Sequence, residues 1–462
     1  MKSPLKNAVI MRVLKVLHAL ITTALLVTCV HIWYMPLLQT QQAVAYSASV
    51  AFIYLMLILI LGRIYGVYRV GVSRIRHLLY AQGLTIFFSC AICYGAICVL
   101  MLRFVNPLPL LVLLVVQAVW CTVWCLLSNR IYFCLHSPQK TVVLYGTEDD
   151  LRVLDGIEYL DRKFTIIDQI AATGSREELQ KALDGAEVAF LTGLSGDLRN
   201  ELMKYCITRD IQCYFPPRVG DVLVSGAEHM QAFRIPLMRV QQAKPPVAYL
   251  AAKRAVDVVA SLVGIVLTSP VMLATAIAIK AYDKGPVLYK QVRLTKDRKE
   301  FKVLKFRSMR ADAEKDGVAR LATENDVRIT PVGRFIRKCR IDELPQLFNI
   351  LKGDMTVVGP RPERPEIARQ YEQEIPSFGL RLQVKAGLTG YAQVYGRYNT
   401  EPYDKLKMDL MYINRMSFPE DLRIMLATVK VLFMKESTEG IGEGCVTASH
   451  KSGEETDELQ SV

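Results

Sequence analysis

Four long apolar runs within the first 130 residues constrain this chain more than any other feature. They cover about Val16–Leu38, Val44–Leu61, Leu84–Leu102 and Leu108–Leu127. Each run is long enough, or nearly so, for a helix to cross a hydrocarbon core of about 30 Å. A helix also satisfies its own backbone hydrogen bonds where no water is present. The sequence therefore predicts a four-helix transmembrane bundle over residues 1–135. The first run is too long, and too much part of a series, for a cleaved signal peptide.

Basic residues beside these runs predict the orientation of the bundle. They precede the first run, separate the second from the third, and follow the fourth. The positions are Lys2, Lys6, Arg12, Lys15, Arg63, Arg69, Arg74, Arg76, Arg130 and Lys140. The two remaining loops carry only Arg103. Because cytosolic loops are the ones enriched in lysine and arginine, both ends of the bundle are predicted to be cytosolic.

The composition agrees with a membrane protein. The chain has 462 residues, 52% of them hydrophobic, and a net charge of +13. This combination is typical of a membrane protein that faces anionic headgroups or anionic substrates. Nucleic acid is the other common partner of a basic chain, and the apolar runs argue against it. The pairs Cys90/Cys93 and Cys121/Cys125 have the spacing of metal ligands, but they lie in apolar runs without histidine partners, which argues against a metal site.

The composition becomes that of a soluble domain after Thr141. Strand-like and helix-like segments alternate over residues 140–243, which predicts a small Rossmann-like parallel α/β domain. A dinucleotide site would need several glycines after the first strand. Here Gly146 stands alone, and the three acids of "TEDD", Glu148 to Asp150, would repel phosphate. The sequence therefore favours a structural or regulatory role for this domain over nucleotide binding.

A fifth apolar run lies between Lys253 and Gly285 and contains Ser269-Pro270. Proline removes a backbone donor and kinks a helix, and each half of the run is too short to cross a bilayer. Both flanks are also basic, so a crossing would place one basic flank outside. We predict a helix–break–helix over residues 253–281 that enters the cytosolic leaflet and returns. An ordinary fifth span with a proline kink is the alternative.

The stretch "RIDELPQLFNILKGDMTVVGPRPERPE" carries the candidate chemistry. Asp342 and Glu343 precede Pro345, which suits the first turn of a helix. Acids at that place can merely complement the helix dipole, but adjacent carboxylates also suit Mg²⁺ with substrate phosphates, and an aspartate can attack phosphorus. Arg361 lies between two prolines, a rigid mount for a guanidinium that grips phosphate.

Two further cations, Lys305 and Arg307, lie in "KFRSM". They fit either an anion site or a basic surface that faces solvent or lipid. Acids, fixed cations and a helix at the membrane surface are together what phosphoryl transfer to a lipid phosphate needs.

Several motifs in this half of the chain occur in the order of a known family. They are Ser269-Pro270, "KFRSM", "DELPQLFNILKGDM", "VGPRPERPE" and "VKAGLTGYAQVYGR". Residues 253–436 resemble the bacterial sugar transferase family, the monotopic polyprenyl-phosphate phosphoglycosyl transferases. The resemblance implies an α+β catalytic domain over residues 247–436, anchored by the re-entrant helix. The four-span start and the α/β domain resemble the long subclass that initiates exopolysaccharide or capsule synthesis.

The resemblance implies a reaction. Asp342 would attack the β-phosphorus of a UDP-sugar, expel UMP and form a covalent phosphosugar-aspartate. Undecaprenyl phosphate would then attack this intermediate and give undecaprenyl-diphospho-sugar. Glu343 would hold Mg²⁺ together with Asp342 and assist proton transfer. Lys305 and Arg361 match family positions near the phosphates, and Arg307 is added from its charge and proximity.

The resemblance extends to the sugar end of the site and to the surroundings of the enzyme. Arg397 in "GLTGYAQVYGR" matches a loop near the nucleotide or the sugar, where Tyr395 replaces a more usual asparagine. The family implies a multi-pass protein of the bacterial plasma (inner) membrane with a cytosolic catalytic domain. Membrane lipids are implied partners, and a homodimer and polysaccharide-assembly proteins are further expectations. The acidic tail over residues 437–462 is predicted to be disordered.

Two other classes of function compete with this reading. A membrane-bound nucleotide-sugar dehydratase or epimerase can also combine four spans with an α/β domain, but it needs a glycine-rich loop that this chain lacks. A non-catalytic membrane scaffold or regulator of polysaccharide assembly would not need both Asp342 and Glu343 together with Arg361.

Overall fold

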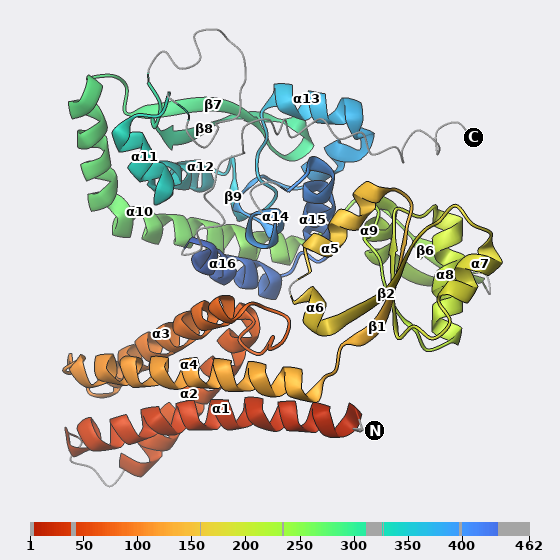
Figure 1. Cartoon of the computed structure of the whole chain (residues 1–462). Coiled ribbons are helices and arrows are strands. Elements are labelled where there is room, and N and C mark those ends of the chain that lie inside the picture. Colours follow the sequence, from red (N-terminus) through yellow and green to blue (C-terminus); the bar gives the residue numbers. More distant parts are fainter. Residues whose placement is uncertain are drawn as a thin grey trace. The chain divides into compact units, whose positions relative to one another are not determined.

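The computed structural model describes residues 4–37, 43–157, 159–232, 235–310, 326, 328–396 and 400–432. The chain divides into two compact units, Met1–Pro216 and Pro217–Val462, which are coloured from red to yellow-green and from green to blue in Figure 1. Each unit is described by itself below.

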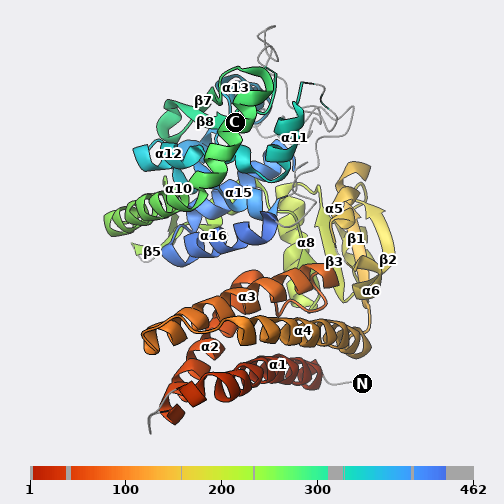
Figure 2. The same ribbon diagram turned by 90° about the vertical axis from the view of Figure 1, so that its left-hand side faces the viewer.

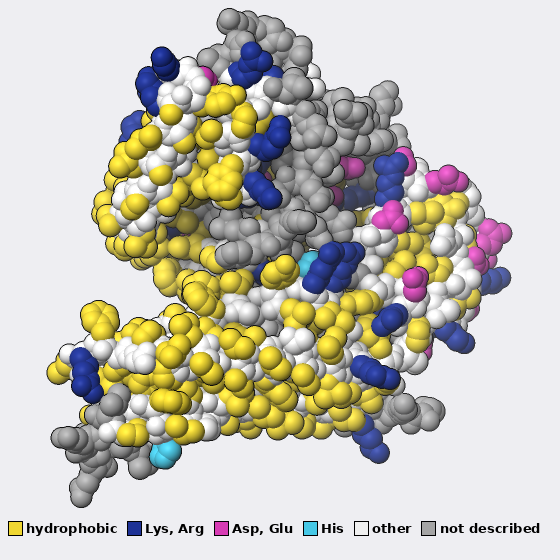
Figure 3. All heavy atoms as spheres, turned by 60° about the vertical axis from the view of Figure 1, so that its left-hand side comes forward, with side chains coloured by type: hydrophobic (Ala, Val, Ile, Leu, Met, Phe, Trp, Pro, Cys, Tyr) yellow, Lys and Arg dark blue, Asp and Glu magenta, His cyan; other side chains and the backbone are white. Residues whose placement is uncertain are grey.

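Four long helices form the first part of the N-terminal unit, as the apolar runs predict. They are α1 (Pro4–Trp33), α2 (Ala43–Tyr65), α3 (Ile75–Leu100) and α4 (Leu108–Leu135). Each packs against two others, and α1 closes the ring on α4. All four are long and apolar enough to cross a membrane, and hydrophobic side chains cover the bundle's surface in Figure 3.

Several polar side chains inside the bundle are hydrogen-bonded, as most buried polar groups are. Gln117 donates to the backbone oxygen of Thr22 at 3.0 Å and accepts from the Tyr54 hydroxyl at 2.9 Å. His18 is buried and stacks on Trp124, with ring centroids 4.2 Å apart. These contacts join all four helices, since the residues come from α1, α2 and α4 and His18 also contacts Gln82 of α3.

The rest of this unit is a four-stranded, fully parallel α/β domain, as predicted. The sheet order is β2-β1-β3-β4. Its strands are β1 (Gln139–Tyr145), β2 (Phe164–Ala171), β3 (Val188–Thr192) and β4 (Gln212–Tyr214). Its helices are α5 (Arg152–Asp155), α6 (Leu160–Lys163), α7 (Arg176–Ala182) and α8 (Gly196–Thr208). The fully buried strand β3 lies next to β1 at the centre of the sheet.

The loop after β1 is filled by protein atoms. Asp150 accepts hydrogen bonds from the backbone and the hydroxyl of Thr147, at 2.7 and 2.8 Å. A Cβ atom at Gly146 would lie 2.2 Å from the backbone oxygen of Gly193, and one at Gly193 would meet the Asp150 carboxylate. The glycines therefore serve the contact between two strand ends, where a nucleotide-binding loop would instead use them to approach a phosphate.

The division between the units lies earlier in the chain than our expected boundary at residue 243. Helix α9 (Val219–Ser225) buries Val219 and Val222 in a core with Leu406 and Leu410 of the C-terminal unit. The antiparallel hairpin of β5 (Glu228–Ala232) and β6 (Ile235–Arg239) follows it. The alternation of strand and helix continues past residue 216, so it does not reveal that these segments pack elsewhere.

The C-terminal unit combines helices with short strands. After α10 (Val247–Asp283), β7 and β8 form an antiparallel pair, whereas β9 and β10 form a parallel pair. The strands are β7 (Leu288–Leu294), β8 (Glu300–Phe306), β9 (Thr356–Val358) and β10 (Gly387–Thr389). The helices are α11 (Pro331–Lys338), α12 (Gln346–Lys352), α13 (Pro365–Glu374), α14 (Tyr391–Tyr395), α15 (Pro402–Asn414) and α16 (Phe418–Leu432). Figure 2 shows α10 and α16 in a second view.

Helix α10 corrects the expected break at Ser269-Pro270, because all 37 residues are helical. The ribbon bends instead (Figure 1). The Ser269 hydroxyl donates to the backbone oxygen of Val266 at 2.8 Å. That oxygen is the i−4 acceptor that the missing N–H of Pro270 leaves without its helix partner. The serine thus supplies the donor that the proline lacks, so the helix bends without being interrupted.

The outer surface of α10 is apolar and little covered by protein. The helix is long and apolar enough to cross a membrane, but only 11% of its apolar window is buried, against 28–33% for the four N-terminal helices. Val266 and Leu267, just before the bend, are 70% and 73% exposed. An exposed apolar surface of this kind marks a site of interaction with membrane or protein.

Candidate active site

Two charged residues of α10, Arg254 and Asp257, hold the elements that carry the candidate site. Arg254 donates to the backbone oxygens of Ile350 and Leu351 at the end of α12, at 2.6 and 2.8 Å. Asp257 accepts from the Thr356 hydroxyl and the Val357 backbone of β9, at 2.8 and 2.9 Å. Because α12 follows Asp342-Glu343 and β9 leads to Arg361, α10 connects the two halves of the candidate site.

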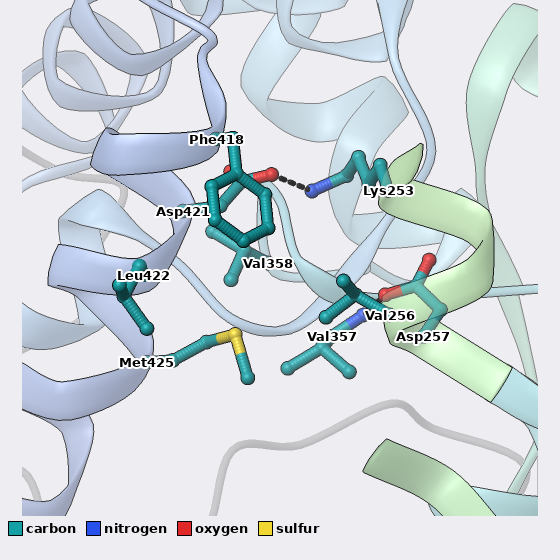
Figure 4. Close-up of a pocket in the computed structure, with 9 residues that line it drawn as sticks. All are labelled: Lys253, Val256, Asp257, Val357, Val358, Phe418, Asp421, Leu422 and Met425. Atoms are coloured by element: carbon teal, nitrogen blue, oxygen red, sulfur yellow. Dashed lines mark hydrogen bonds and ion pairs between the residues drawn. The ribbon is translucent and has the colours of Figure 1, made fainter. Parts of the chain in front are cut away.

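A small apolar cavity of about 60 Å³ lies between α10, β9 and α16 (Figure 4). Lys253 of α10 reaches Asp421 of α16 at 2.7 Å beside the cavity. The Asp421 carboxylate also accepts from the hydroxyls of Tyr249 and Tyr412, at 2.8 and 2.7 Å. Because Lys253 and Asp421 satisfy each other's charge, we interpret the cavity as a packing gap between α10 and its neighbours. The candidate chemistry lies elsewhere.

Asp342 and Glu343 lie in a short 3₁₀ turn, Ile341–Glu343, between α11 and α12. Arg340 before the turn has a left-handed backbone, with φ 54°, and Pro345 is the N-cap residue that directly precedes α12. The predicted short helix after the acids is thus confirmed, and Gly353 ends it with φ 98°. The sharp turn places two adjacent carboxylates at the helix start.

Glu343 joins two of the predicted cations. Its Oε1 atom accepts from Lys305 of β8 at 2.9 Å and from Arg361 at 2.8 Å. The structure therefore brings together four of the residues singled out in the sequence, because Asp342 adjoins Glu343. The Glu343 side chain is 13% exposed, whereas that of Arg361 retains 42%. Arg361 can therefore hold Glu343 and still face a ligand.

The environments of the two carboxyl groups separate their pKa values. Burial raises the pKa of Asp342, and the charge of Glu343 raises it further, against the lowering effect of Lys305. For Glu343 burial also acts to raise the pKa, but the charges of Arg361 and Lys305 outweigh it and hold the pKa well below its usual range. Glu343 is thus a fixed anion, and Asp342 is the more basic carboxylate.

The turn that carries Arg361 is held through its backbone. Arg381 donates to the backbone oxygen of Arg361 at 3.0 Å, and Arg293 donates to that of Pro362 at 3.1 Å. Glu363 lies 3.5 Å from Arg381 and 3.8 Å from Arg293. The prolines fix the backbone dihedral angles, and the two arginines fix the position of the turn.

Arg381 is itself held by Asp409 of α15, at 2.7 Å. The two side chains are 3% and 1% exposed. Sequence reasoning missed this pair, although Asp409 lies on a helix face with the buried Leu406, Leu410 and Ile413. An acid within an apolar helical face needs a partner, and that pattern could have indicated a buried ion pair.

The other predicted residues that the structure describes make contacts outside this group. Arg307 is 7% exposed and makes a bidentate ion pair with Asp283 at the end of α10, so its guanidinium is already committed. Ser269 and Pro270 form the bend of α10. Arg397 lies outside the described residues, as does the acidic tail.

The Asp342 and Glu343 carboxylates fit an Mg²⁺ ion whose other ligands are water and substrate phosphates. Among the described residues no group of three or more His, Cys, Asp or Glu could hold a metal ion. Mg²⁺ is commonly bound through one or two carboxylates together with substrate phosphates and water. Asp342 and Glu343 can supply those two, although one oxygen of Glu343 is engaged by Lys305 and Arg361.

Comparison with known proteins places this site in a family. The family model described as "Bacterial sugar transferase" matches residues 248–435, which hold every contact of the site. The chain is 42% identical over 191 residues to the UDP-N-acetylgalactosamine-undecaprenyl-phosphate N-acetylgalactosaminephosphotransferase of Aeromonas hydrophila, covering 41% of this chain and 45% of that one. It is 44% identical over 190 residues to the UDP-glucose:undecaprenyl-phosphate glucose-1-phosphate transferase of Klebsiella pneumoniae, covering 40% and 41%.

A shorter relative is covered more completely. The chain is 49% identical over 134 residues to the putative undecaprenyl-phosphate N-acetylgalactosaminyl 1-phosphate transferase of Bacillus subtilis, covering 29% of this chain and 74% of that one. The matches to the Aeromonas and Klebsiella proteins span less than half of those proteins. The residues that the family model matches all lie in the C-terminal unit.

Proposed function

The chain belongs to the bacterial sugar transferase family, and on this premise we propose that it transfers a sugar 1-phosphate from a UDP-sugar to undecaprenyl phosphate and releases UMP. The product would initiate the repeat unit of an exopolysaccharide, capsule or O-antigen. The observation that carries the proposal is the arrangement of Asp342 beside Glu343, with Lys305 and Arg361 both bound to Glu343. It combines a basic carboxylate with fixed cations, which phosphoryl transfer requires.

In the first step a carboxylate oxygen of Asp342 attacks the β-phosphorus of the UDP-sugar. The new bond joins Asp342 to that phosphorus, and the bond from the β-phosphorus to the bridging oxygen breaks. UMP leaves with the electron pair of that bond. The raised pKa of Asp342 suits a nucleophile, because a more basic carboxylate donates its electrons more readily. Arg361 and Lys305 lie where they can stabilise charge on the phosphoryl oxygens.

In the second step a phosphate oxygen of undecaprenyl phosphate attacks the same phosphorus. The bond between Asp342 and phosphorus breaks, which restores the carboxylate and yields undecaprenyl-diphospho-sugar. The sum of the two steps consumes no oxidant and no net proton. Glu343 stays ionised throughout, because its pKa is held low, and keeps Lys305 and Arg361 in place.

Asp342 and Glu343 would hold Mg²⁺ together with the donor's phosphates. The ion would supply neutralisation of charge on the diphosphate. The protein's own cations, Lys305 and Arg361, occupy one side of Glu343, which leaves the other carboxylate oxygens for the ion and its water ligands.

We further propose that α10 is re-entrant and that the catalytic unit lies at the cytosolic face of the bacterial inner membrane. The bend at Pro270, the low burial of α10 and the basic residues on both of its flanks support this placement. The N-terminal α/β domain would be a Rossmann-like domain with a structural or regulatory role, since Asp150 fills its first loop.

Release of UMP is the measurement that tests the proposal. The full chain in nanodiscs would be mixed with Mg²⁺, undecaprenyl phosphate and a panel of UDP-sugars. We expect UMP from at least one sugar, and a loss of at least about 1,000-fold in Asp342→Asn, as for other removed nucleophiles. Without undecaprenyl phosphate, one equivalent of UMP and a stable sugar-phosphate adduct on a peptide containing Asp342 are expected.

The controls separate the reaction from the nucleophile. UMP released equally by Asp342→Asn would retain the reaction and reject Asp342 as the nucleophile. No UMP from any UDP-sugar, with folded protein and an active transferase run alongside, would reject the proposed reaction and favour a scaffold. The Lys407→Met variant, which changes a cation of α15 paired with Asp404, should match the unmodified protein.

A further inference from the structure

Lys405 of α15 is a partly buried cation beside the Arg361 turn for which the mechanism above has no use. It lies one helical turn before Asp409, so the two share a helix face. Asp409 binds Arg381, and Arg381 in turn donates to the backbone oxygen of Arg361. The face of α15 that holds Arg381 therefore also directs Lys405 toward the Arg361 turn.

The electrostatic surroundings of Lys405 agree with this placement. Its charge interacts with those of Glu363, Arg381, Arg361 and Asp409. Burial is the largest cause of a lowered pKa of Lys405, and the two arginines lower the pKa further. An ammonium group in such a position is stabilised by any anion that reaches it.

The nearby carboxylates are already engaged by other cations. Asp409 and Glu363 both contact Arg381, and Glu363 also faces Arg293. The side chain of Lys405 has no hydrogen bond or ion pair within the part of the chain that the structure describes. By contrast, Lys407 on the same helix reaches Asp404 at 2.7 Å and lies over the ring of Tyr403. One of the two lysines is thus satisfied, and the other has its ammonium group available.

The charges around the Arg361 turn favour an anion. Cations outnumber carboxylates in this group, which contains Lys305, Arg361, Arg293, Arg381 and Lys405 with Asp342, Glu343, Glu363 and Asp409. The charges of Arg337, Arg340 and Arg364 also act on it. Three of the carboxylates are bound by the first four cations. A phosphate group carries the charge and the oxygen acceptors that would complete this cluster.

We propose that Lys405 is a further substrate-binding residue, whose ammonium group binds a substrate phosphate next to Arg361. The inference rests on the proposed function, which supplies two phosphate-bearing substrates. The phosphate belongs either to the diphosphate of the UDP-sugar or to undecaprenyl phosphate. Either phosphate would present the same kind of oxygen acceptor to Lys405. Kinetics measured with each substrate varied in turn would show which phosphate it binds.

The test compares Lys405→Met, Lys405→Gln and Lys405→Arg with Lys407→Met, each in the full chain in nanodiscs. The KM and kcat of UMP release would be measured while the UDP-sugar, and then undecaprenyl phosphate, is varied. Binding of UMP would be measured separately by calorimetry. We expect Lys405→Met to raise one KM by about 10- to 100-fold, the loss of one charge-assisted hydrogen bond. The kcat should change less, Lys405→Arg should restore most of the affinity, and Lys407→Met should change neither value.

The pattern identifies the phosphate. A higher KM for the UDP-sugar together with weaker UMP binding supports the donor diphosphate. A higher KM for undecaprenyl phosphate with unchanged UMP binding supports the acceptor. Unchanged values of both KM and of the UMP affinity in Lys405→Met and Lys405→Gln would overturn the proposal. If the unmodified protein releases no UMP from any sugar, yet binds UMP more tightly than Lys405→Met does, the proposed reaction fails and the phosphate site stands.

Discussion

Adjacent residues in this site have opposite properties, because their charged neighbours differ. Glu343 has Lys305 and Arg361 at 2.9 and 2.8 Å, and its pKa falls. Burial raises the pKa of Asp342, and the charge of Glu343 raises it further. Two carboxyl groups that interact this strongly titrate as a pair. The difference in pKa assigns the anchoring of the cations to Glu343 and the nucleophilic role to Asp342.

This separation predicts the pH dependence of UMP release. Asp342 must be ionised to attack, so activity should fall as the pH drops through its raised pKa. Glu343→Gln removes a charge that raises the pKa of Asp342, so the fall of activity at low pH should move to lower pH. Lys305→Met removes a charge that lowers this pKa, so the fall should move to higher pH. Both variants should also be slower. The profile of kcat/KM against pH gives both shifts, and shifts in the same direction would contradict the assignment.

At the scale of the element, α10 combines two kinds of attachment. Its inner face is held by charged residues, among them Arg254 and Asp257, and its outer face is apolar and exposed. The bend at Pro270 is completed by the Ser269 hydroxyl. An unsatisfied backbone oxygen in an apolar environment is costly, so this single side chain stabilises the bent helix.

Replacing Ser269 tests that role. Ser269→Ala should destabilise the C-terminal unit by about 1 kcal/mol, the usual contribution of one such hydrogen bond. Ser269→Thr keeps the hydroxyl and should behave like the unmodified protein. The midpoint of thermal unfolding in nanodiscs gives the comparison. An alanine variant as stable as the threonine variant would show that the Val266 oxygen does not need this donor.

At the scale of the whole molecule, the placement of α10 decides on which side of the membrane the chemistry occurs. A re-entrant α10 leaves Cys339, an exposed residue after α11, on the cytosolic side. A crossing α10 would place it outside. The loop between α3 and α4 contains Phe104, which is 93% exposed. This loop is predicted to face the periplasm because Arg103 is its single basic residue.

A membrane-impermeant maleimide measures this difference in a variant with Cys134 and Cys445 replaced by serine. We expect Cys339 to react in inside-out vesicles and to stay unlabelled in intact spheroplasts. Phe104→Cys should show the reverse pattern and serves as the matched control. Labelling of Cys339 in intact spheroplasts would establish a crossing helix and reject the re-entrant placement.

Sequence reasoning predicted what depends on local composition and spacing. The four apolar helices, the parallel α/β sheet and the short helix after the acids were all foreseen in this way. The group of Asp342, Glu343, Lys305 and Arg361 was expected from the resemblance to the sugar transferase family. Apolar length and turn chemistry are properties of neighbouring residues, so a single chain displays them directly.

The choice of partners for charged and polar side chains was decided only by the tertiary structure. Arg307 pairs with Asp283, Asp409 with Arg381, and the Ser269 hydroxyl keeps α10 continuous where a break was expected. Each interaction depends on the distance and burial of specific atoms rather than on composition. The apolar pattern therefore determines which segments form helices, whereas folding decides which cations are engaged and leaves Lys405 beside Arg361 to meet a ligand.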